Sequence, residues 1–65
     1  MDILKTLQAL RRDGWLILIQ GDDNGWLFVL EGGASGRYEY SAKTIRTAVE
    51  RAKRGDPSDD GTAPW

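Results

Sequence analysis

The chain has 65 residues and a net charge of −1, and it contains neither cysteine nor histidine. Disulfide bonds, zinc sites built from Cys and His, and haem ligation by these side chains are therefore excluded. A domain of this length buries only about 60% of the surface that its unfolded chain exposes. Without a disulfide or a zinc ion as a staple, we expect association with another chain to supply part of the stability.

The distribution of charge and hydropathy bears on location and partners. Residues 41–54 are basic, and residues 55–65 are acidic. The sequence has no apolar stretch of the length that spans a bilayer, and its first residues lack the pattern of a signal peptide. We therefore expect a cytoplasmic protein that does not enter the membrane.

The first predicted element is a helix over residues 2–13. Asp2 is a favourable N-cap, and Gly14 is suited to a left-handed residue that ends the helix. Apolar residues recur at helical spacing at Ile3, Leu4, Leu7 and Leu10.

Three strands are predicted to follow. Residues 15–20 and 26–31 are rich in Trp, Ile, Val and Phe, and GDDNG between them predicts a hairpin. A two-residue turn at Asn24-Gly25 pairs Ile19 with Leu30 and Gln20 with Val29, and a four-residue turn keeps the same parity. The segment RYEYS, residues 37–41, alternates as a third strand with one wet face.

The second predicted helix spans residues 42–54, with Ser41 as its cap and Gly55 after its end. Its apolar stripe consists of Ile45, Ala48, Val49 and Ala52. Residues 56–65, DPSDDGTAPW, have no periodicity and are predicted to be a flexible acidic tail ending in Trp65.

These elements predict one compact domain, residues 1–55, of the α+β class. The expected order is α-β-β-β-α, with a three-stranded antiparallel meander and both helices packed on one face.

Both faces of the predicted sheet carry apolar side chains. Because side chains alternate along a strand, one set is fully apolar and is expected beneath the helices. It consists of Trp15, Ile17, Ile19, Trp26, Phe28, Leu30, Tyr38 and Tyr40. The opposite face then presents an apolar patch, typical of an interaction surface, with Arg37 and Glu39 at its polar rim. We expect Leu16, Leu18, Leu27 and Val29 to form this patch. Three alternatives could cover this patch: a second copy of the chain, a different protein, or the tail with Trp65 as a lid.

No catalytic machinery is predicted. Asp22, Asp23 and Asn24 lack the later ligands of a calcium loop and fit turn chemistry. The serines have no histidine to activate them, and the glycines match no phosphate-binding loop. We therefore expect a protein that is not an enzyme and has no cofactor, metal or small-molecule substrate.

The basic second helix is the strongest nucleic-acid signal, because such a run can neutralise phosphates. The candidate residues are Lys43, Arg46, Arg51, Lys53 and Arg54.

The order of elements resembles the double-stranded-RNA-binding domain, in which the second helix opens with phosphate-binding lysines. Lys43 and Arg46 stand near that place, and the loop histidine of that family has no equivalent. Residues 16–53 also resemble the HicB-type antitoxin fold, in which a helix opening with Thr-Leu-x-x-Ala follows the strands. Here that segment reads Thr44-Ile45-Arg46-Thr47-Ala48.

The sequence therefore predicts a small protein-binding module that docks its apolar sheet face on a partner protein or a second copy. Its size and its lack of catalytic groups are also typical of inhibitors made by phages or mobile elements. The alternative is nucleic-acid binding through the second helix.

Overall fold

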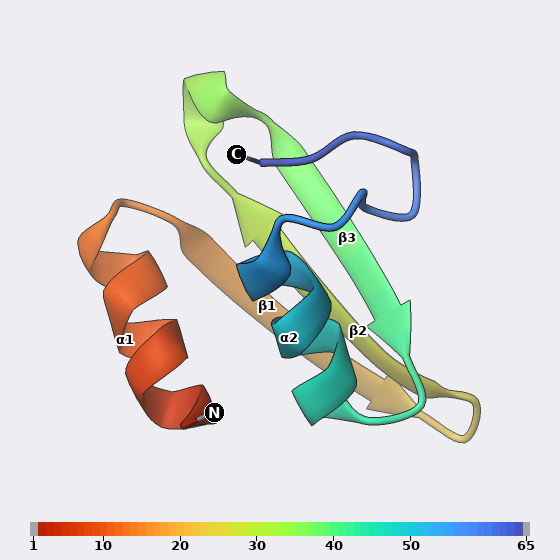
Figure 1. Ribbon diagram of the computed structural model, residues 1–65. Coiled ribbons are helices and arrows are strands. Elements are labelled where there is room, and N and C mark those ends of the chain that lie inside the picture. The colour runs from red at the N-terminus through yellow and green to blue at the C-terminus, as the bar shows by residue number, and fades with distance from the viewer. Residues whose placement is uncertain (1, 65) are drawn as a thin grey trace.

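The computed structural model describes residues 2–64 and confirms the α-β-β-β-α order. The elements are α1 (Ile3–Arg12), β1 (Leu16–Asp22), β2 (Gly25–Glu31), a short 3-10 turn η1 (Gly33–Ser35), β3 (Arg37–Ala42) and α2 (Ile45–Arg54). The three strands form one antiparallel sheet in the order β1-β2-β3. Figure 1 shows this meander with α1 on the β1 side, and α2 packs on β2 and β3.

The ends of α1 follow the expected capping chemistry. The Asp2 carboxylate accepts a hydrogen bond from the Lys5 N–H at 3.2 Å, which satisfies one of the donors that a helix start leaves without a partner. Gly14 adopts φ 96° after the helix, a conformation in which a side chain is disfavoured. The chain therefore leaves α1 sharply and enters β1.

The hairpin closes through a two-residue loop that lies one position earlier than Asn24-Gly25. Ile19 pairs with Phe28, and the ladder continues to Asp22 opposite Gly25, leaving Asp23 and Asn24 as the loop. The Asp22 carboxylate accepts from the Asn24 N–H at 2.8 Å, which favours a turn one residue earlier than Asn24-Gly25. The Ile19–Leu30 pairing is therefore wrong by two residues, a shift that leaves every side chain on its expected face.

Helix α2 begins three residues later than the sequence predicts. Thr44, in place of Ser41, is the N-cap, and its hydroxyl accepts from the Thr47 N–H at 3.2 Å. Ser41 lies within β3, which continues to Ala42 because it pairs with β2 as far as Trp26. Gly55 ends the helix in the left-handed conformation, with φ 78°, as expected.

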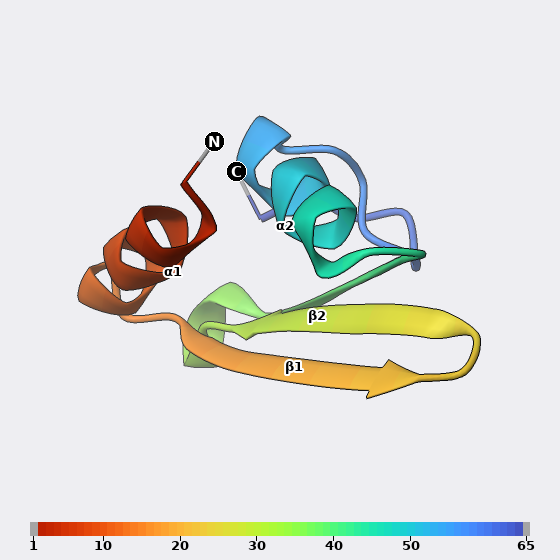
Figure 2. The same ribbon diagram turned by 90° about the horizontal axis from the view of Figure 1, so that it is seen from below.

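The hydrophobic core lies between the two helices and one face of the sheet (Figure 2). The aromatic face is the one that packs on the helices, as the alternation predicts. Phe28, Leu30 and Tyr40 are fully buried against Ala48 and Val49. At one end of the sheet, Trp15 meets Tyr38 edge to face, with ring centroids 5.9 Å apart.

The segment after α2 follows a defined path along β3. The Asp59 N–H donates to the Glu39 carbonyl at 2.8 Å, and the Asp59 carboxylate accepts from the Ser41 N–H at 3.1 Å. The Tyr40 hydroxyl donates to the Asp56 carbonyl at 2.9 Å, and Ser58 is buried. The sequence predicts a flexible tail, whereas these contacts place its first half against the outer edge of β3.

Candidate functional site

The helix-free face of the sheet carries a smaller apolar patch than the sequence predicts. Leu16 is 69% exposed and Leu18 is 46% exposed, both on β1. Leu27 is partly buried on β2, whereas Val29 is only 1% exposed. The accessible patch therefore consists of Leu16, Leu18 and part of Leu27, and the expectation that Val29 is accessible is corrected.

Position within the sheet explains the burial of Val29. It lies on the central strand, directly between Leu18 of β1 and Glu39 of β3. Val29 is absent from the cluster of side chains beneath the helices. The side chains that bury it therefore lie on the helix-free face. A side chain on the edge strand β1 has such neighbours on one side only, which leaves Leu16 and Leu18 exposed.

The predicted polar rim is present, and its charges are paired with one another. Arg37 lies 3.4 Å from the Glu39 carboxylate and 3.7 Å from that of Glu31. All three side chains are about half exposed, so each pair contributes little to stability, roughly 0–1 kcal/mol. With one arginine and two glutamates, the rim beside Val29 carries a net charge of −1.

Other exposed apolar side chains lie on the opposite face, which the sequence analysis assigns to the core. Ile19 and Trp26 are each 42% exposed, at the hairpin end of β1 and β2. The Trp26 ring lies over the neighbouring strand, since a Cβ on Gly21 would meet it at 2.8 Å. Neither helix covers this end, so β1 is accessible on both of its faces.

The two edges of the sheet differ. The outer edge of β3 is bonded to Asp59 through Glu39 and Ser41. Within residues 2–64, β1 pairs only with β2, so its outer edge has no strand beside it. The order of a meander already makes its first strand an outer one, so this open edge follows from the order of the strands.

Two of the basic residues of the alternative site, Arg51 and Arg54, contact acidic residues of the tail. The Arg51 guanidinium donates to the Ser41 carbonyl at 2.6 Å, lies 3.4 Å from Asp59 and sits 5.4 Å from the centre of the Tyr40 ring. Arg54 pairs with Asp56 at 2.6 Å and holds the pKa of that carboxyl below its usual value. The acidic tail thus pairs with part of the helix.

The remaining basic residues lie elsewhere on and before α2. Lys53 borders a hollow on the α1 side, together with Lys5. Lys43 and Arg46 are exposed. Trp65, predicted as an interface residue, lies outside the described residues.

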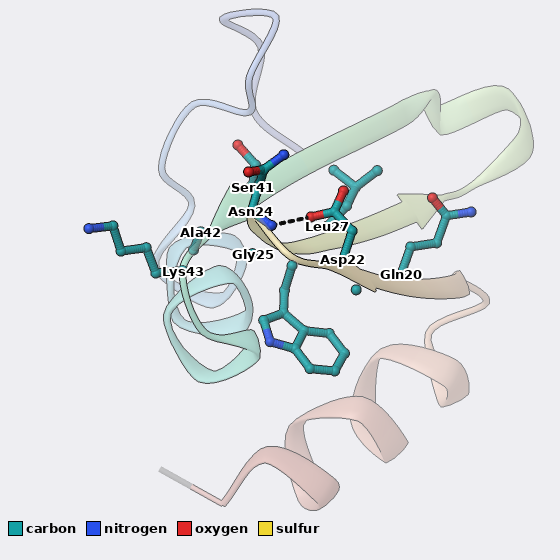
Figure 3. Close-up of a pocket in the computed structure, with 10 residues that line it drawn as sticks. Gln20, Asp22, Asn24, Gly25, Leu27, Ser41, Ala42 and Lys43 are labelled. Carbon is teal, nitrogen blue, oxygen red and sulfur yellow. Dashed lines mark hydrogen bonds between the residues drawn. The ribbon is translucent and has the colours of Figure 1, made fainter.

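A shallow hollow lies at the hairpin end of the sheet. Its walls are Gln20, Gly21, Asp22, Asn24, Gly25, Trp26, Leu27, Ser41, Ala42 and Lys43. These residues come from both faces of the sheet, and Figure 3 shows the labelled side chains pointing in different directions. They therefore wrap around the hairpin tip and do not converge on a reacting group.

Residues 2–64 hold neither a cluster of metal-binding side chains nor a membrane-spanning helix. This part of the chain contains no group of three or more acidic, His or Cys side chains placed to hold a metal ion. None of its helices has the length and hydropathy needed to cross a membrane.

The fold and the patch define a small α+β domain with a partly apolar open sheet. No family model, no curated protein and no solved structure matches the chain. The order of elements is the one that double-stranded-RNA-binding domains share, but no family match accompanies either resemblance.

Proposed function

We propose that the protein is a protein-binding module that docks another chain on the helix-free side of its sheet. The exposure of Leu16 and Leu18, next to each other on one face of an edge strand, carries this proposal. Exposed apolar side chains gathered in one place on a small domain are typical of contact surfaces. The polar rim formed by Arg37 and its two glutamates would orient the partner.

The small size of the domain supports the same function. Its buried core consists of few residues, and burial of an aliphatic side chain contributes roughly 1.5–3 kcal/mol. Covering Leu16 and Leu18 would therefore add appreciably to the stability of a domain with so little core. An inhibitor or antitoxin-like protein would use such a surface, with action by binding alone.

A photo-crosslinking amino acid at position 18 tests this proposal in cells that express the protein. The matched control carries the same group at Gln8, which is exposed on α1 and away from the patch. We expect a protein chain to be crosslinked from position 18 and not from position 8, and Leu16→Asp to abolish the product. Equal crosslinking from both positions, or none from position 18, would contradict the proposal.

A further inference from the structure

We infer that the docked chain is a second copy, which pairs its β1 antiparallel with β1 of the first. The two three-stranded sheets would then join edge to edge into one continuous sheet. The inference rests on the proposed function, because it names the partner of the same surface. It adds that the contact is made by the strand edge as well as by the leucines.

Strand β1 has an edge that is open to pairing. Natural edge strands avoid association through charged side chains, proline, bulges or a covering segment. Residues 16–20 of β1 read Leu-Ile-Leu-Ile-Gln, without charge or proline. The ladder from Leu16 to Asp22 is regular and has no bulge, and the tail covers the opposite edge of the sheet. The protection is therefore confined to β3.

The backbone N–H and C=O groups of β1 alternate in direction between β2 and the free edge. In a two-residue hairpin the residues that flank the loop, here Asp22 and Gly25, exchange hydrogen bonds, and bonded pairs then alternate along the ladder. This alternation directs the N–H and C=O groups of Ile17 and Ile19 toward the free edge. Gly21 faces the same edge, and antiparallel pairing centred on the isoleucines matches those of one copy with those of the second.

That match determines how the two copies face each other. Residues paired across strands lie on the same face, so the helices of both copies come to the same side of the joined sheet. Leu16 and Leu18 of both copies then gather on the other side as cross-strand neighbours, about 4.5–5.5 Å apart between Cβ atoms. The arrangement is a twofold one in which each surface contacts its own equivalent.

The two ends of β1 carry opposite charge. Arg11 and Arg12 close α1 just before β1 and outweigh the single charge of Asp13 beside them, and Asp22 and Asp23 lie at the other end of β1. Figure 1 shows the C-terminal end of α1 beside the start of β1. Antiparallel pairing brings the basic end of one copy toward the acidic end of the other, twice in each dimer. A parallel arrangement would place like charges together and is disfavoured.

Light scattering over a range of concentrations, combined with amide hydrogen exchange, tests the inference on the full chain. We expect a dimer in which the Ile17 and Ile19 amides exchange slowly, and faster exchange of both after dilution to the monomer. Ile19→Lys should yield a monomer, because lysine on an edge strand opposes pairing. The control Gln8→Lys adds the same charge on the outside of α1 and should remain dimeric.

A charge exchange tests the direction of pairing. Arg12→Asp and Asp23→Arg should each weaken the dimer several-fold, and the variant with both changes should recover most of the affinity. Both side chains are exposed, so we expect the folded monomer to tolerate the changes. Failure of the double variant to recover, with both single variants weakened, would overturn the antiparallel arrangement.

Two other outcomes overturn the inference in different ways. A dimer that Leu18→Asp dissociates and Ile19→Lys leaves intact, with Ile17 and Ile19 amides that exchange alike at all concentrations, would mean packing by faces and not by edges. The proposed function would survive that result. A monomer at all concentrations would exclude a second copy as the partner. The proposed function would then depend only on whether position 18 crosslinks to a different protein.

Discussion

The backbone N–H of Asp59 donates to the carbonyl of Glu39 at 2.8 Å, so a residue of the tail occupies the outer edge of the sheet. The Asp59 carboxylate also accepts from the Ser41 N–H and lies 3.4 Å from Arg51. This one residue therefore gives β3 a partner while β1, on the opposite side of the sheet, has none among residues 2–64. The difference between the two edges underlies both proposals.

Removal of the Asp59 side chain should loosen the tail. Asp59→Ala deletes the acceptor of the Ser41 N–H and the partner of Arg51. We expect a loss of about 1 kcal/mol in the free energy of unfolding, because both contacts are partly exposed. Urea denaturation measures it, and Gln8→Ala, at an exposed position on α1, is the control. Equal effects of the two changes would contradict the role of Asp59.

The start of α2 can be tested with a matched pair of substitutions. Thr44→Ala removes the hydroxyl that accepts from the Thr47 N–H, and loss of such a cap costs about 1 kcal/mol. Ser41→Ala should have a clearly smaller effect, because Ser41 is exposed and its backbone N–H and C=O bond to Asp59 and Arg51. Thermal unfolding followed by circular dichroism compares the two variants. A larger loss for Ser41→Ala would mean that the helix begins where the sequence alone predicts.

Two glycines lie beneath tryptophan rings and should differ in their tolerance of alanine. A Cβ on Gly32 would approach the Trp15 ring to 2.6 Å, and one on Gly21 would approach the Trp26 ring to 2.8 Å. Trp15 packs against the core, whereas Trp26 is 42% exposed and has room to move. Gly32→Ala should therefore cost roughly 1–3 kcal/mol, and Gly21→Ala less. Urea denaturation followed by tryptophan fluorescence measures both losses of stability. A larger loss for Gly21→Ala than for Gly32→Ala would contradict this prediction.

Val29 should behave as a core residue although no helix covers it. Val29→Ala removes methyl groups from a side chain that is 1% exposed, so we expect a loss of roughly 1–3 kcal/mol. Leu18→Ala, at a concentration where the chain is monomeric, should cost less because Leu18 already contacts water. Equilibrium unfolding measures both. Similar small losses would show that Val29 is accessible after all.

The pKa of the Asp56 carboxyl should respond to a single substitution. A hydrogen bond from Arg54 lowers this pKa below 3.8, and bonds from Ser58 and Thr62 lower that of Asp60. A lowered pKa in the folded state stabilises the tail above pH 3.8, and this contribution is lost as the pH falls through the lower, folded value. In an NMR titration, Arg54→Gln should raise the Asp56 pKa toward 3.8 and leave Asp60 unchanged. An unaltered Asp56 pKa would contradict the pairing.

The candidate site was only partly predictable from the sequence. The two sets of side chains were assigned to the correct faces, because alternation along a strand is a local property. Leu16 and Leu18 are accessible as expected. The burial of Val29 and the exposure of Ile19 were missed, since each depends on which strands and helices lie beside it.

By itself, the sequence determined the number, order and type of the elements. Capping by Asp2, the left-handed glycines after both helices and the apolar periodicity act within a few residues. Tertiary structure decided the hairpin register, the cap at Thr44 and the course of the tail along β3. These features depend on contacts between residues far apart in the chain. The same is true of the difference between β2, which has a strand on each side, and β1, whose outer edge is open.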